Sequence, residues 1–126
     1  MKYEWLDGYL LSFPGAEKRW HPGWKMFLYE VRGKQFAAVC APEEKYQTYG
    51  GHELVNLKCG PDRAEALRLV NPEILPGFYM DKRSWIACLL DGQLPDELLR
   101  QLAGESYRLI VAKLPKYVQR ELAETT

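Results

Sequence analysis

Apolar side chains recur at helical spacing in three segments of the chain. Residues 5–13 carry one apolar stripe, and Pro14-Gly15 then ends that helix. Residues 61–70 begin with Pro61 and Asp62, which suit the first turn of a helix. The third helix, from Pro95 to Lys113, repeats apolar residues with the period of one buried face. The residues expected to face inward from the second and third helices are Ala64, Leu67, Val70, Leu98, Leu99, Leu102, Ala103, Ser106, Leu109 and Ile110.

Other segments are rich in β-branched and aromatic residues, as strands usually are. Residues 24–31 and 34–40 flank Arg32-Gly33, a two-residue turn that predicts a β-hairpin. Residues 54–59 alternate so that one face of the strand is apolar, and residues 84–90 form a further strand. A short extended segment is expected at residues 78–80, after Pro76-Gly77. The segments interpreted as loops, because they contain Pro or Gly, are residues 20–23 and 41–51.

The predicted order is therefore helix, three strands, helix, two strands, helix. Strands in hairpins, without regular alternation of strand and helix, favour an antiparallel sheet with helices on one side. The expected fold class is α+β in two layers. We expect one domain over residues 1–126, with a core of about residues 2–116 and a tail or short helix at residues 117–126.

The charge balance limits the choice of partners. The chain has 17 Lys and Arg against 17 Asp and Glu, so its net charge is zero, whereas nucleic-acid-binding domains are usually basic. Any basic patch must therefore be local. Cys40, Cys59 and Cys88 form no CxxC pair, which favours buried thiols in a reducing cytoplasm. The apolar run Trp85–Leu90 is too short to cross a membrane, which needs about 20 residues.

Signatures of catalysis and metal binding are missing from the sequence. His21 and His52 have no metal-ligating residue three or four positions away, and neither GxSxG nor a glycine-rich phosphate loop occurs. We therefore expect no enzyme activity, no catalytic residue, no cofactor and no metal site.

Cationic residues lie beside aromatic residues at several places along the chain. A hairpin tip with cations can follow phosphates, and aromatic rings can stack on bases. The alternative is that such tips carry Lys or Arg for solubility and to protect a sheet edge. The candidate nucleic-acid-binding residues are Arg32, Lys34, Lys58, Lys82, Arg83, Trp85, Lys113 and Lys116.

A series of short segments in fixed order resembles the MmcQ/YjbR family over nearly the whole chain. The segments are Pro14-Gly15-Ala16, Val31–Ala37, Asn56–Cys59, Pro76–Trp85, Leu94–Leu99, Ser106-Tyr107 and Val111–Lys116. The resemblance implies a CyaY-like or secretion-chaperone-like α+β fold with an antiparallel sheet. It also implies DNA binding through a double-wing arrangement of hairpins, without enzymatic activity or a cofactor.

Three residues depart from the pattern of that family. Asp81 and Ser84 stand where the family typically has Asn and His, and Glu30 stands where a basic residue is frequent. Because the two carboxylates repel phosphate, we expect DNA binding to be weak and directed mainly at the backbone.

Two other functions are compatible with the sequence. The first is a protein-interaction module or homodimer that uses the open face of the sheet, to which exposed aromatic residues would contribute. The second, ranked last, is an enzyme or small-molecule binder in which residues 81–83 and Trp85 line an anion pocket. The aromatic residues expected at a protein-interaction surface are Trp20, Trp24, Tyr46 and Tyr49.

Overall fold

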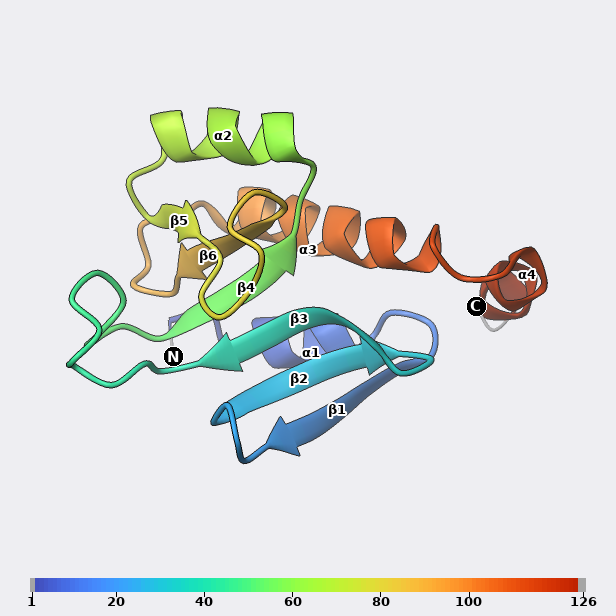
Figure 1. Cartoon of the computed structure of the whole chain (residues 1–126). Helices are drawn as coiled ribbons and strands as arrows, with labels where there is room; N and C mark the ends of the chain where they lie inside the picture. Colours follow the sequence, from blue (N-terminus) through green and yellow to red (C-terminus); the bar gives the residue numbers. More distant parts are fainter. Residues whose placement is uncertain (1, 125–126) are drawn as a thin grey trace.

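A computed structural model describes residues 2–124 and contains one six-stranded antiparallel sheet with the strand order β1-β2-β3-β4-β6-β5 (Figure 1). The strands are β1 (Ala16–His21), β2 (Met26–Val31), β3 (Lys34–Cys40), β4 (Leu54–Lys58), β5 (Ile74–Pro76) and β6 (Trp85–Leu89). The helices are α1 (Leu6–Leu11), α2 (Pro61–Val70), α3 (Asp96–Val111) and α4 (Lys116–Glu124). The predicted α+β class with an antiparallel sheet is confirmed, and the hairpin around Arg32-Gly33 joins β2 to β3.

Strand β1 is an element that the sequence analysis missed. It pairs with β2 along its whole length, from Ala16 opposite Val31 to His21 opposite Met26. The loop interpretation is therefore wrong for Trp20 and His21. The reason is that β1 is an edge strand whose central residues are exposed, so it carries charges instead of alternating apolar residues.

The helices pack on one face of the sheet and enclose the larger core. Figure 1 shows α1 and α3 behind the strands, and their side chains join those of β2, β3, β4 and β6 in one apolar cluster. The prediction that Val70 and Leu109 face inward is wrong, because they are 77% and 38% exposed. Tyr107 is buried instead, and its hydroxyl donates to the carbonyl of Pro14 at 2.6 Å.

The opposite face of the sheet is covered in part by two loops, residues 41–53 and 77–84. These loops enclose a second apolar cluster. Strand β4 is consequently buried on both faces, so the prediction of a single apolar face is wrong. The open face expected for a protein partner is reduced accordingly. The members of this second cluster are Met26, Leu28, Ala38, Cys40, Leu54, Phe78, Ala87 and Leu89.

Asn56 anchors the second of these loops to the sheet. It is fully buried, its Nδ2 donates to the carbonyl of Phe78 at 2.9 Å, and its Oδ1 accepts the Phe78 N–H at 2.9 Å. The prediction of an extended segment at residues 78–80 is wrong, because the backbone bends there and Tyr79 has a positive φ of 63°. The strand lies just before them, at β5, where it pairs with β6.

Residues 116–124 form the helix α4, and two of its side chains belong to the core. Val118 and Leu122 are 7% and 3% exposed and join the helix-side cluster. None of the helices within residues 2–124 is long and apolar enough to cross a membrane.

Candidate functional site

A hollow of about 350 Å³, here called the lysine hollow, lies where four elements meet. Strand β3 begins there, β4 ends there, β6 begins there, and the chain leaves α3 there. Four of the eight candidate binding residues come together in it. The residues that line it are Lys34, Gln35, Lys58, Trp85, Ile110 and Lys113.

The register of the sheet explains why two of these residues are neighbours. Lys58 is the last residue of β4 and lies opposite Trp85, the first residue of β6. Cross-strand partners project on the same side of a sheet. The Lys58 Nζ accordingly lies 5.6 Å from the centroid of the Trp85 ring. Lys34 enters the hollow because it directly follows the tight turn at Arg32 and Gly33, whose φ angles are 49° and 80°.

Positive charge accumulates in the lysine hollow. Partial burial, followed by the charge of Lys113, lowers the pKa of Lys58 below its ordinary value. The Lys58 Nζ donates a hydrogen bond to the Ser84 Oγ at 3.1 Å. Within residues 2–124, none of Lys34, Lys58 and Lys113 forms an ion pair. Uncompensated ammonium groups around one hollow favour an anion there.

Asp81 is the nearby carboxylate that opposes this charge. A hydrogen bond from the Arg83 N–H, at 2.9 Å, lowers the pKa of Asp81, so the group stays ionised at neutral pH. Its charge also raises the pKa of Lys58, although less than burial and Lys113 lower it. Asp81 does not line the lysine hollow, but its charge acts on Lys58, which does.

Ser106 connects the elements around the lysine hollow through two hydrogen bonds, which were not predicted from the sequence. Its fully buried Oγ donates to the Phe36 carbonyl at 2.6 Å and accepts the Lys58 N–H at 2.8 Å. Helix α3 is thereby fixed to both β3 and the end of β4. The signal in the sequence is a hydroxyl within the apolar stripe between Leu102 and Ile110.

The other four candidate residues lie outside the lysine hollow. The Arg32 guanidinium pairs with Glu121 of α4 at 3.0 Å. The Lys82 Nζ donates to the Gly77 carbonyl at 2.9 Å and lies 5.6 Å from the Tyr49 ring centroid. Arg83 is exposed beside Asp81, and Lys116 is the exposed first residue of α4.

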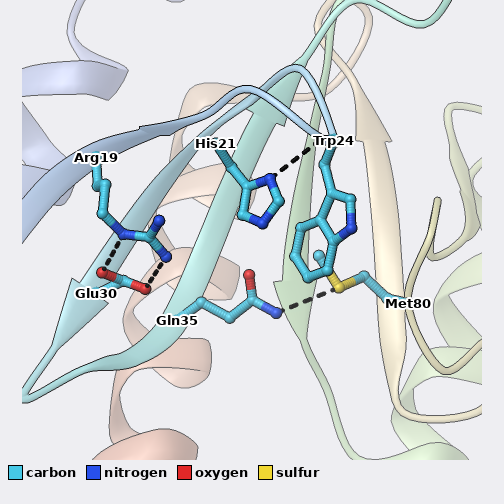
Figure 2. A network of polar contacts seen from close by, with 6 residues as sticks. All are labelled: Arg19, His21, Trp24, Glu30, Gln35 and Met80. Carbon is cyan, nitrogen blue, oxygen red and sulfur yellow. Dashed lines mark hydrogen bonds and ion pairs between the residues drawn. The ribbon is translucent and has the colours of Figure 1, made fainter.

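A second hollow of about 310 Å³, here called the sheet-face hollow, lies on the face opposite the helices (Figure 2). Both oxygens of Glu30 accept hydrogen bonds from Arg19, at 3.2 and 3.0 Å, so Arg19 offsets the repulsion expected from Glu30. The His21 and Trp24 rings stack, with centroids 4.2 Å apart. The residues that line it are Arg19, His21, Trp24, Leu28, Glu30, Gly33, Lys34 and Gln35.

The thiols of Cys40 and Cys88 and the imidazole of His52 lie outside the lysine hollow. Burial raises the pKa of Cys40 and of Cys88 to about 12, which keeps these thiols protonated and unreactive. His52 contacts Asp91 at 2.7 Å in a partly exposed pair. The described part of the chain contains no group of three or more side chains arranged to hold a metal ion.

Comparisons with known proteins match most of the chain. The YjbR family model matches residues 11–109. The uncharacterized protein YjbR of Escherichia coli K12 is 32% identical over 116 residues, which cover 92% of each chain. The uncharacterized protein YbdF of Escherichia coli O157:H7 is 29% identical over 112 residues, which cover 89% of this chain and 86% of the relative.

Two solved structures share the fold. The Deinococcus radiodurans protein DR2400 superposes with a TM-score of 0.79 at 26% identity, covering 94% of this chain and 85% of its own. A Pseudomonas syringae protein superposes with a TM-score of 0.72 at 26% identity, covering 86% of this chain and 98% of its own.

Proposed function

The chain belongs to the YjbR family, and we propose that it binds nucleic acid through the phosphate backbone at the lysine hollow. The observation that carries the proposal is the convergence of Lys34 of β3, Lys58 of β4 and Lys113 just after α3, without an ion pair to any described carboxylate. Ammonium groups in such an arrangement favour phosphate, which supplies most of the affinity in sequence-independent binding.

The number of lysines sets the expected strength of binding. Each phosphate contact contributes about −0.9 to the slope of log K against log salt on duplex DNA, so three contacts predict a slope of about −3. Affinity in the non-specific range, with a Kd of roughly 10⁻⁴ to 10⁻⁶ M near physiological salt, is expected. The negative charge of Asp81, which acts on Lys58, opposes tighter binding of phosphate.

Fluorescence anisotropy with a labelled duplex, at several salt concentrations between about 50 and 200 mM, tests the proposal. The double variant Lys58→Met and Lys113→Met keeps the aliphatic stems and removes two charges, so the slope should fall to about −1. Lys25→Gln is the matched control, because Lys25 is exposed, pairs with Glu43 and lies outside the lysine hollow. The proposal is wrong if no binding occurs at low salt, or if the double variant binds like the control.

Protein association is a second candidate, favoured by two neighbouring exposed apolar side chains on α2. Leu69 is 81% exposed and Val70 is 77% exposed. If these residues mediate self-association, light scattering should give a mass that rises with concentration, and Leu69→Glu should abolish that rise. A concentration-independent monomer mass would exclude self-association through α2.

A further inference from the structure

The lysine hollow and the sheet-face hollow are adjacent, because Lys34 and Gln35 line both of them. We call the two hollows together the joined groove. One end carries the stacked rings of His21 and Trp24, and the other end carries Lys58 and Lys113. Four cationic side chains and one carboxylate line it, and the carboxylate, Glu30, is held by Arg19. The joined groove therefore combines an aromatic end with a cationic end.

The aromatic end offers a surface for stacking. The His21 and Trp24 rings are nearly parallel, at 13°, and the His21 Nδ1 accepts the Trp24 backbone N–H at 3.0 Å (Figure 2). This hydrogen bond fixes the position of the neutral imidazole and leaves its proton on Nε2, as a donor. Trp24 is 39% exposed and also borders a smaller hollow beside Tyr46 and Tyr79. The stacked pair is thus both rigid and accessible.

Gln35 lies between the two ends and carries an unsatisfied polar group. Its Nε2 contacts the Met80 Sδ at 3.5 Å, and its Oε1 is buried without a hydrogen-bond partner among the described residues (Figure 2). Sulfur is a weak acceptor, so exchanging the amide oxygen and nitrogen would also leave one end of the amide poorly paired. Because the Oε1 is buried, a ligand in the hollow can pair with this amide only after the Gln35 side chain turns outward.

We propose that the joined groove binds single-stranded nucleic acid in preference to duplex, with a base against Trp24 and phosphates on the three lysines. This inference rests on the proposed function and specifies its ligand. Stacking on exposed aromatic rings beside a cationic track is how proteins hold single strands without reading their sequence. A base within a duplex is already stacked and must be flipped out at a cost before it reaches Trp24.

The size of the groove agrees with this ligand. The two hollows have volumes of about 310 and 350 Å³, each at the lower end of the range for sites that enclose a small organic molecule. Each hollow is therefore large enough to take a group the size of one nucleotide.

Anisotropy titrations of the full chain with labelled oligo-dT, oligo-U and a mixed-sequence duplex, all at low salt, test the inference. Trp24→Ala should weaken binding of the single strands by about fivefold to a hundredfold, the range measured when one stacking side chain is removed. Trp24→Phe should recover most of that loss. Binding of the duplex should change less than twofold in both variants. Comparing oligo-dT with oligo-U shows whether DNA or RNA is preferred.

Trp20→Ala is the matched control. Trp20 is 47% exposed on neighbouring β1, but it packs against Phe27 and lies outside the joined groove. The inference is overturned, and the proposed function stands, if the duplex binds through Lys58 and Lys113 while Trp24→Ala behaves like Trp20→Ala. If no oligonucleotide binds even at low salt, the proposed function fails and the inference fails with it.

Discussion

Asn56 performs with one side chain what a neighbouring strand would do with its backbone, since its amide both donates to and accepts from Phe78. Asn56→Leu should leave the N–H and the carbonyl of Phe78 buried and unpaired, and should lower the free energy of unfolding by about 2–4 kcal/mol. Urea unfolding followed by tryptophan fluorescence measures this loss. Ser12→Ala, at an exposed hydroxyl, is the control and should change stability by less than about 0.5 kcal/mol. A loss no larger than that of the control would show that the Asn56 bonds contribute little.

Asp7 gives the fold a dependence on pH. Hydrogen bonds from Lys18, at 2.8 Å, and from the Tyr29 hydroxyl, at 2.6 Å, lower the pKa of Asp7 below its ordinary value of 3.8. The ionised form is therefore favoured by folding. Its contribution is complete above the ordinary pKa and is lost as the pH falls through the lowered one.

The variant Asp7→Asn removes this contribution. At about pH 7 it should cost up to about 1 kcal/mol, a small value because the side chains of Asp7 and Lys18 are 45% and 35% exposed. The difference from the unmodified chain should shrink as the pH falls below 3.8, as measured by urea unfolding across the acid range. Glu44→Gln, in an exposed loop, should show no such trend. A difference that stays constant with pH would contradict the assignment.

At the scale of elements, α4 completes the helix-side core. Leu122 is 3% exposed, so Leu122→Ala should reduce the free energy of unfolding by about 2–4 kcal/mol. Leu69→Ala, at a side chain that is 81% exposed on α2, should change it by less than about 0.5 kcal/mol. Calorimetry or urea unfolding of both variants checks the contrast. Equal effects would mean that α4 packs only loosely in solution.

The elements that could be predicted from sequence are those with a local signal. The hairpin was predictable because Gly33 permits the positive φ that its turn requires, and α3 because its apolar period is long. Strand β1 was not, because its pairing with β2 buries little of its own surface. The burial of Leu54 on the second face of β4 depends on how the loops of residues 41–53 and 77–84 fold over the sheet, which the alternation within the strand does not report.

For the candidate site, the sequence indicated which residues have suitable chemistry but not which of them lie together. Lys58 and Trp85 were both selected from sequence as cation and aromatic, but only the strand register places them opposite each other. Lys113 joins them because Ser106 fixes α3 to β4. Arg32 and Lys82 were selected for the same chemical reason, yet each is held by a partner outside the hollow.

At the scale of the whole molecule, lysines far apart in sequence should respond together to a ligand. Modification by an amine-specific acylating reagent, measured by mass spectrometry, should decrease at Lys34, Lys58 and Lys113 when an oligonucleotide is bound. Lys25 and Lys45, which lie outside the joined groove, should be modified equally with and without it. Uniform protection of all five would contradict a localised site.

The unpaired lysines have a further consequence in a chain whose net charge is zero. The charge gathered in the lysine hollow is balanced by an equal excess of negative charge over the remainder of the molecule, so the protein is an electric dipole. The field of a polyanion turns the positive end of such a dipole toward the polyanion. If the chain binds nucleic acid as proposed, this dipole should turn the lysine hollow toward the polyanion before contact.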